Sequence, residues 1–156
     1  MAAPSGLYQL VRATVTTSTA ITINQVTSVA GVAEEFTRAW VNQNTVTATA
    51  QCRIQFLRKS GVATVTSQAA TAMGNGMQAS KCVNGTTATG ITATIEGTDG
   101  SVYIEEGFNI VNGWLYLPVP EERKMMVGAD TSALKFPTAP TSAGWISGIE
   151  WLEYAG

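Results

Sequence analysis

The sequence predicts an all-β protein with one domain, a β-sandwich of jelly-roll type with short strands and long loops. Apolar and polar residues alternate in about ten short segments, which is the pattern of strands with one buried face. Turn-forming Gly, Pro and Asn residues separate these segments at intervals of roughly 10 to 15 residues, as they do in sandwiches. No segment has the apolar spacing of a full-length amphipathic helix.

The first half of the chain begins with small, uncharged side chains, so we expect a flexible N-terminal arm at residues 1–6 and the sandwich domain at residues 7–156. Strict alternation would place Phe36, Arg38 and Trp40 on one face of a strand. The strands predicted in this half lie at residues 8–16, 21–23, 36–41, 45–58 and 62–67.

The second half opens with a long surface loop, expected at residues 68–84. Thr98-Asp99-Gly100 predicts a tight turn that joins neighbouring strands in a hairpin, and Asn112-Gly113 predicts another turn. The strands predicted here lie at residues 86–96, 102–105, 108–111, 114–117, 125–127, 133–136 and 146–154.

The stretch at residues 113–122 concentrates the most unusual residues of the chain. Its aromatic half favours a strand, whereas Pro118 and Pro120 lack the amide protons that a central strand needs. We therefore expect Glu121, Glu122 and Arg123 to form an extended arm off the sheet, able to reach a neighbouring subunit.

The four tryptophans are expected to anchor the core, since each would bury roughly 150 to 250 Å². Trp145 is the expected exception, because Pro137, Pro140 and Gly144 place it near an irregular, exposed connection.

Charged residues make up 13% of the chain, against about 25% in an average domain. A surface rich in Thr and Ser suits close contact with other proteins, although Thr as a strand former explains the same composition. Six basic and two acidic residues give residues 1–90 a charge of +4, and three basic and nine acidic residues give the rest −6. The net charge of −2 offers no reason to expect a nucleic acid or a membrane as partner.

No catalytic apparatus is visible, so we expect neither an enzyme nor a cofactor. The absence of histidine removes the Ser-His-Asp and Cys-His arrangements and most transition-metal sites. The three adjacent glutamate pairs point to opposite faces if they lie on strands, so none forms an acid/base dyad by itself. Cys52 and Cys82 fit no metal spacing and are expected to be two buried thiols, with a disulfide as the alternative. No signal peptide or apolar run of 18 residues is present, so we expect a soluble protein made in a cytoplasm.

The sequence resembles a group of small virion proteins of tailed bacteriophages. The strongest block is Phe-Asn-Ile-Val-Asn-Gly-Trp-Leu-Tyr-Leu-Pro-Val-Pro-Glu-Glu-Arg at residues 108–123. Arg-Ala-Trp-Val at 38–41, Arg-Ile-Gln-Phe-Leu-Arg-Lys-Ser at 53–60, the Thr/Gly-rich stretch at 86–97 and the acidic-aromatic segment at 149–154 complete the likeness.

This resemblance implies a β-sandwich that decorates, or cements, a virus capsid as a homotrimer, with the major capsid protein as partner and the virion as location. A tail or baseplate component is the alternative, and a carbohydrate-binding jelly roll with Trp145 or Tyr116 stacked on sugars is another. The candidate assembly contacts are Ala2, Ala3, Pro4, Pro118, Pro120, Glu121, Glu122, Arg123 and Trp145.

Overall fold

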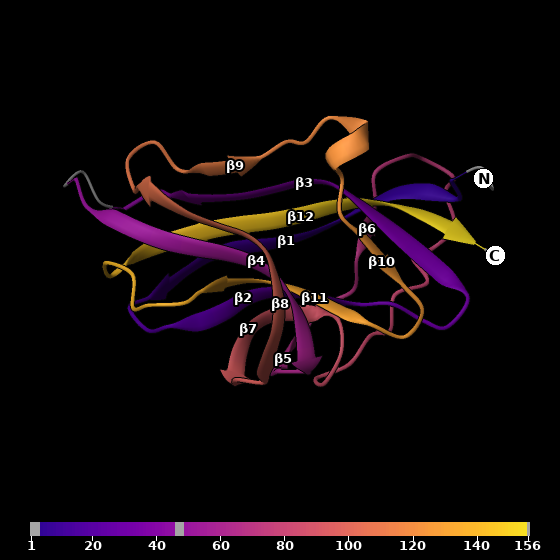
Figure 1. The fold of residues 1–156 in the computed structure, drawn as a ribbon, viewed down its shortest axis with the longest axis horizontal. Helices are drawn as coiled ribbons and strands as arrows, with labels where there is room; N and C mark the ends of the chain where they lie inside the picture. Colours follow the sequence, from indigo (N-terminus) through magenta and orange to yellow (C-terminus); the bar gives the residue numbers. More distant parts are fainter. Residues whose placement is uncertain (1–3, 46–48, 156) are drawn as a thin grey trace.

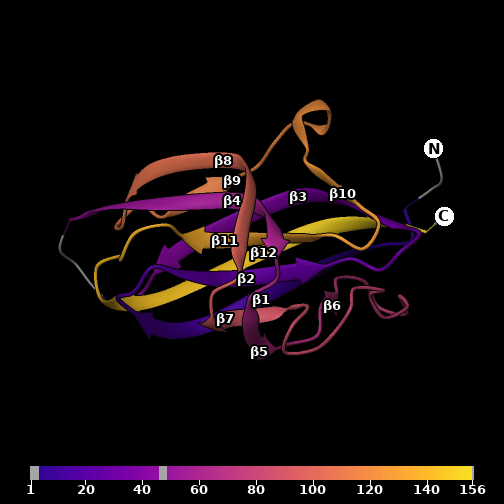
Figure 2. The same cartoon turned by 60° about the horizontal axis from the view of Figure 1, so that its bottom comes forward.

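A computed structural model describes residues 4–45 and 49–155 of the chain. Two antiparallel sheets of six strands each pack on one another (Figure 1), and in a second view the strands of one sheet overlap those of the other (Figure 2). The predicted all-β sandwich is therefore confirmed. Among the described residues the one helical element is η1 (Pro120–Glu122), a single 3-10 turn.

The first sheet has the strand order β10-β3-β12-β1-β6, and β9 pairs with the same edge of β3 as β10 does. Its strands are β1 (Gly6–Thr17), β3 (Val32–Gln43), β6 (Thr71–Ala72), β9 (Trp114–Tyr116), β10 (Met125–Val127) and β12 (Ala143–Ala155). The second sheet has the order β5-β7-β2-β11-β4-β8. Its strands are β2 (Ile21–Thr27), β4 (Gln51–Gly61), β5 (Thr64–Ser67), β7 (Gly90–Ile95), β8 (Thr98–Asn109) and β11 (Thr131–Phe136).

Aromatic rings fill the core between the sheets. Phe36 of β3 meets Phe56 of β4 edge-on, with 4.9 Å between the ring centroids, and so joins the two layers. Phe136 of β11 and Trp145 of β12 also join the layers, with 5.0 Å between ring centroids and the ring planes tilted at 57°. Trp145 is 0% exposed, so its predicted exposure is wrong. β12 already begins at Ala143, and this early start carries Trp145 into the sandwich.

Trp40 is the tryptophan that lies on the outer face. The register between β3 and β12 shifts at Thr37, where a β-bulge inserts one residue. Phe36 therefore faces the core while Arg38 and Trp40 face outward, which corrects the predicted single face for all three. The Arg38 guanidinium lies 4.7 Å from the Trp40 ring centroid. The ring also covers Gly148, where an added Cβ would clash with it.

The predicted hairpin around Thr98-Asp99-Gly100 is wrong. These residues form the start of β8, which pairs with β4 from Gly61↔Thr98 to Gln51↔Asn109. β7 instead pairs with β2 and β5. Two residues join β7 to β8 although these strands stand far apart in the strand order, so the second sheet must curl to bring its ends together.

The N-terminal arm is shorter than predicted. β1 starts at Gly6, and the Ser5 N–H donates to the Glu153 carbonyl at 2.6 Å, so only Pro4 of the described residues belongs to an arm. The loop predicted at residues 68–84 is interrupted by β6, and the connection from β6 to β7 then covers residues 73–89 and contains Cys82. Cys52 and Cys82 are both free and buried, as predicted.

Candidate functional site

The edge of the first sheet beyond β3 is built from two short strands and a projecting turn. β9 pairs with β3 at residues 39–41 and β10 pairs with it at residues 33–35. The segment between β9 and β10 leaves the sheet and stands away from the body of the molecule as η1 (Figure 2). The two prolines explain this departure, because neither can donate a proton to β3.

The projecting segment is a folded turn, so the predicted extended arm at Glu121, Glu122 and Arg123 is wrong. The Glu122 N–H donates to the Val119 carbonyl at 3.0 Å, and Pro120 begins the turn with the fixed φ that suits it. The Arg123 guanidinium then donates to a Glu35 carboxylate oxygen of β3 at 2.8 Å. This ion pair draws the chain back to the sheet.

Five large apolar side chains of this edge are each more than half exposed. On β9 and the turn the alternation places them outward while Trp114 and Tyr116 face inward, and on β10 they flank the buried Met126. We call this set the apolar edge: Leu115 (54%), Leu117 (68%), Val119 (55%), Met125 (54%) and Val127 (67%). Exposed apolar side chains gathered on unpaired edge strands mark a surface for contact with another protein.

A shallow groove of about 290 Å³ lies between β8 and the start of the apolar edge. The Trp114 indole N–H donates to a Glu106 carboxylate oxygen at 2.6 Å, and its ring stacks on Tyr116 with 6.5 Å between centroids. The Tyr116 hydroxyl donates to the Glu122 carbonyl at 3.3 Å. The polar side-chain atoms of Trp114 and Tyr116 are thus already partnered, and the volume of the groove is at the lower limit for a small-molecule site. It suits an apolar side chain of a partner.

A second hollow, of about 370 Å³, is polar. Arg58 and Asp130 both line it and form an ion pair, with 2.6 Å between the guanidinium nitrogen and the carboxylate oxygen. Next to it the buried Lys59 ammonium binds Asp99 at 2.7 Å and Glu96 at 3.2 Å. These charges neutralise one another, which is the arrangement of a structural ion-pair network.

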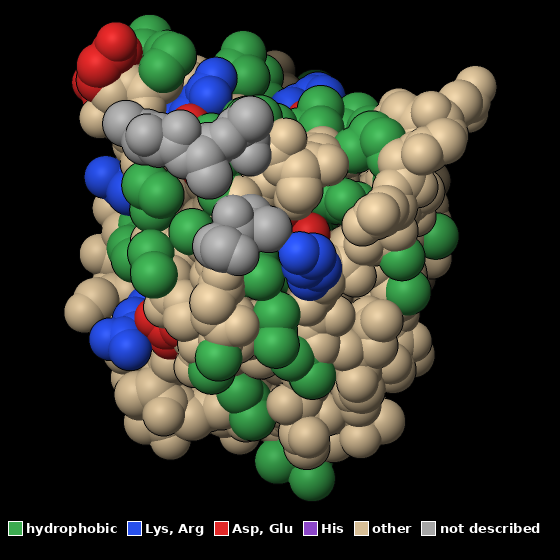
Figure 3. All heavy atoms as spheres, turned by 90° about the vertical axis from the view of Figure 1, so that its right-hand side faces the viewer, with side chains coloured by type: hydrophobic (Ala, Val, Ile, Leu, Met, Phe, Trp, Pro, Cys, Tyr) green, Lys and Arg blue, Asp and Glu red, His purple; other side chains and the backbone are tan. Residues whose placement is uncertain are grey.

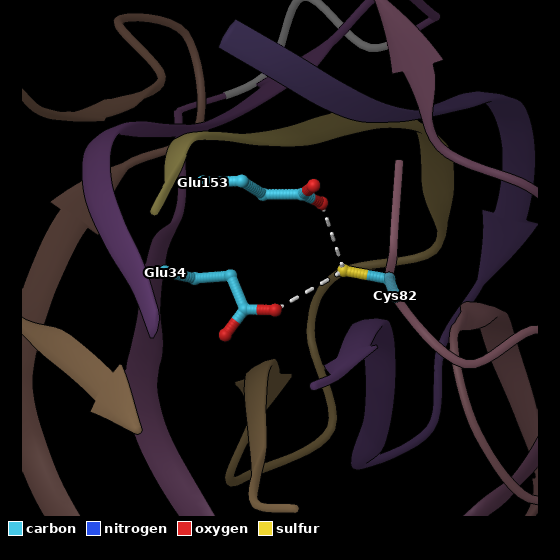
Figure 4. Close-up of side chains that lie close together, drawn as sticks. All are labelled: Glu34, Cys82 and Glu153. Atoms are coloured by element: carbon cyan, nitrogen blue, oxygen red, sulfur yellow. Dashed lines mark hydrogen bonds between the residues drawn. The ribbon is translucent and has the colours of Figure 1, made fainter. Parts of the chain in front are cut away.

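Two carboxylates and a thiol meet in the interior beneath the loop between β6 and β7 (Figure 4). Glu34 of β3 and Glu153 of β12 are direct cross-strand partners, and both are 0% exposed. The Cys82 sulfur lies 3.5 Å from Glu34 Oε1 and 3.7 Å from Glu153 Oε1. Burial raises the pKa of Glu34 to about 7 and raises the pKa of the Cys82 thiol well above its usual range. We call this group the Glu34–Cys82–Glu153 cluster.

The predicted contact residues fall into separate regions. Pro118, Pro120, Glu121, Glu122 and Arg123 lie together on the projecting segment, with both glutamates exposed and Arg123 half-buried. Pro4 is exposed next to the strand end that holds Glu153, and the buried Trp145 can touch no partner. Ala2 and Ala3 lie outside the described residues.

Sequence reasoning missed the apolar edge and the Glu34–Cys82–Glu153 cluster. For Leu115, Leu117 and Val119 the period-two spacing was a usable signal, since they must share a face opposite Trp114 and Tyr116. For the cluster no signal existed in the spacing, because its members lie 48 and 71 residues from one another.

Comparisons with known proteins leave the family open. No protein-family model matches the chain, and neither the curated proteins nor the solved structures give a significant match. Within the described part of the chain, no helix has the length and apolar character needed to cross a membrane.

Proposed function

We propose that this chain is a non-enzymatic structural protein of a virion that attaches to the assembled capsid through the apolar edge and stabilises the shell. The observation that carries this proposal is the apolar edge itself. It exposes five large apolar side chains on two short edge strands and on the segment that joins them, in a chain that otherwise has an ordinary buried core. The bacteriophage resemblance of residues 108–123 points to a capsid as the assembly, with the major capsid protein as partner.

The physical basis of attachment is burial of the apolar edge. Apolar area removed from water contributes about 25 cal/mol per Å² before the costs of association are counted. Pro118 and Pro120 keep the segment stiff, so little conformational entropy is lost on docking. Many copies that bind only the assembled shell then stabilise it by mass action.

Part of the molecular surface is rich in uncharged side chains, which suits a broad protein interface. The end of the molecule that holds the two chain ends shows mostly polar uncharged and apolar atoms, with Lys, Arg, Asp and Glu side chains scattered among them (Figure 3). Depletion of charge is typical of the central part of protein interfaces.

Trp145, one of the two residues proposed to stack on sugars in the carbohydrate-binding alternative, is buried. Trp145 lies in the core with 0% exposure, so it cannot stack on a sugar ring. Tyr116 packs its ring against Trp114 and Phe56 and uses its hydroxyl within the protein. Protein contact at the apolar edge is therefore the better supported function.

The test is binding to purified capsids that lack this protein, followed by imaging of the particles. We expect occupancy at regular lattice positions and hundreds of copies per particle. Leu117→Ser should weaken this binding at least about fivefold, since loss of one interface anchor costs about 1 kcal/mol or more. Ile95→Ser is the matched control, because Ile95 is equally exposed (66%) but lies on β7 of the other sheet.

Two outcomes would contradict the proposal. Capsids without any regular occupancy would exclude a decoration role, and a copy number of tens or fewer in native virions would favour the tail or baseplate. Equal loss of binding in Leu117→Ser and Ile95→Ser would show that the apolar edge is not the contact.

A further inference from the structure

The Glu34–Cys82–Glu153 cluster lacks the positive charge that its buried carboxylates require. Glu34 and Glu153 stand directly opposite each other on neighbouring strands, where two like charges are destabilising. Within the described ranges neither forms an ion pair with Lys or Arg. Ionised carboxylates taken out of water are strongly unfavourable unless a counter-charge accompanies them.

The two carboxylates also differ in how well they are hydrogen-bonded. Glu153 accepts bonds from the Ser80 hydroxyl, the Trp151 indole at 3.2 Å and the Lys81 N–H at 3.1 Å. Glu34 faces Cys82 with Oε1, whereas its Oε2 has no partner in the described part of the chain although it is fully buried. This oxygen points away from the thiol (Figure 4), so the oxygen that faces Cys82 is Oε1. A buried carboxylate with one oxygen unpartnered is incompletely satisfied, and such groups call for an explanation such as a bound ion.

The separation of the three donor atoms suits a small divalent cation. A tetrahedral zinc ion with a Zn–S bond of about 2.3 Å and a Zn–O bond of about 2.0 Å sets its sulfur and oxygen ligands about 3.5 Å apart. The observed sulfur-to-oxygen distances of 3.5 and 3.7 Å agree with this value. Thiolate as a ligand favours Zn²⁺ over Mg²⁺ or Ca²⁺, which prefer oxygen alone.

We propose that Glu34, Cys82 and Glu153 bind one zinc ion, which fastens the loop between β6 and β7 to the ends of β3 and β12. The ion takes the place of the thiol proton of Cys82, which passes to solvent. Its two positive charges offset the two carboxylates and the new thiolate in part, so the net charge of the cluster changes from −2, with both carboxylates ionised and the thiol neutral, to −1. This site is structural and independent of the proposed attachment through the apolar edge.

The test uses the full chain prepared without a polyhistidine tag. The sequence has no histidine, so the background of metal binding is low. We expect one zinc ion per chain by mass spectrometry of the metal content, and a melting temperature that falls when a chelator removes the ion. Co²⁺ added to the chelated protein should produce thiolate-to-cobalt charge-transfer absorption in the near ultraviolet.

The chain offers its own matched control in the second buried thiol. Cys82→Ser should abolish the charge-transfer absorption, whereas Cys52→Ser, which alters an equally buried cysteine (6% exposed in both), should keep it. Glu34→Gln should weaken Co²⁺ binding by more than the ~10-fold that follows loss of an outer-shell partner.

The wild-type protein alone can overturn the proposal. A folded wild-type chain with no stoichiometric metal, no Co²⁺ charge-transfer absorption and a melting temperature unaffected by Zn²⁺ would show that protons alone neutralise the cluster. Absorption that persists in Cys82→Ser but is lost in Cys52→Ser would place the metal elsewhere. Because the wild-type readings do not depend on any variant being stable, a variant that fails to fold leaves that part of the test intact.

Discussion

Glu34 and Glu35 are neighbours in sequence and meet opposite environments. Alternation along β3 turns Glu34 into the core and Glu35 outward, as predicted for adjacent residues on a strand. Glu35 accepts hydrogen bonds from the Tyr154 hydroxyl of β12 and from Arg123. First the Tyr154 bond and then the Arg123 bond hold the pKa of Glu35 below its ordinary value. Glu35 is thus the residue that ties η1 to the sheet.

The lowered pKa of Glu35 predicts a dependence of stability on pH. A carboxyl group with a lower pKa in the folded state contributes stability above its unfolded pKa of about 4.3 and loses it as the pH falls through the folded value. Glu35→Gln should therefore be less stable than wild type near pH 7, and the difference should shrink below about pH 4. Urea unfolding between pH 3 and 7 measures this. A difference that stays constant over the range would show that the charge of Glu35 is not what stabilises the protein.

Among the strands, the short connection between β7 and β8 depends on a buried ammonium. Lys59 of β4 has a fully buried side chain and binds both Glu96, in the connection, and Asp99 of β8. Lys135 of β11 completes the network with a 2.6 Å bond to Asp99. The network holds the curled end of the second sheet together where the connection leaves only two residues between strands.

Removal of the Lys59 charge should destabilise this end of the sandwich. Lys59→Met keeps much of the side-chain volume but leaves two carboxylates with Lys135 alone, and we expect a loss on the order of 1–3 kcal/mol in the free energy of unfolding. Arg53→Met is the control, because Arg53 pairs with Glu105 at the surface and such pairs contribute about 0–1 kcal/mol. Chemical denaturation compares the two variants. Equal losses would mean that burial of Lys59 adds nothing to its ion pairs.

For the whole molecule, the sequence predicted the strands better than their partners. Period-two alternation is a local property, so it identified segments such as the one that became β12, but it carries no information about which strand lies alongside. The hairpin at Thr98 failed for this reason, since the partner of β8 is β4. The bulge at Thr37 was equally hidden, because the extra residue shows only against the register of β12.

The candidate site shows the same contrast between residue spacing, which the sequence reveals, and strand pairing, which it does not. Leu115 and Leu117 could be placed on one face by their spacing, whereas Met125 and Val127 join them only because β9 and β10 share an edge of β3. Glu34 and Glu153 meet through the pairing of β3 with β12. Contacts that depend on the pairing of strands far apart in the sequence could not be predicted from the sequence alone.

The two glutamates on the projecting turn allow capsid attachment to be tested separately from folding stability. Glu121 and Glu122 are exposed on η1, and no hydrogen bond or ion pair of either side chain occurs among the described residues. Their replacement should therefore change the free energy of unfolding by no more than about 0.5 kcal/mol. At a partner surface, exposed charge pairs contribute about 0.2–1 kcal/mol each, so loss of both should weaken capsid binding by about twofold to thirtyfold.

We expect Glu121→Ala with Glu122→Ala to bind capsids more weakly while melting at nearly the wild-type temperature. The double glutamine variant is the control for shape, because it removes the charges and keeps the side-chain length; it should lose as much affinity as the alanine variant if charge is responsible. Higher salt should reduce the difference from wild type, since screening weakens exposed charge contacts. A fall in melting temperature together with unchanged attachment would show that the turn serves the fold and that the capsid contact lies elsewhere.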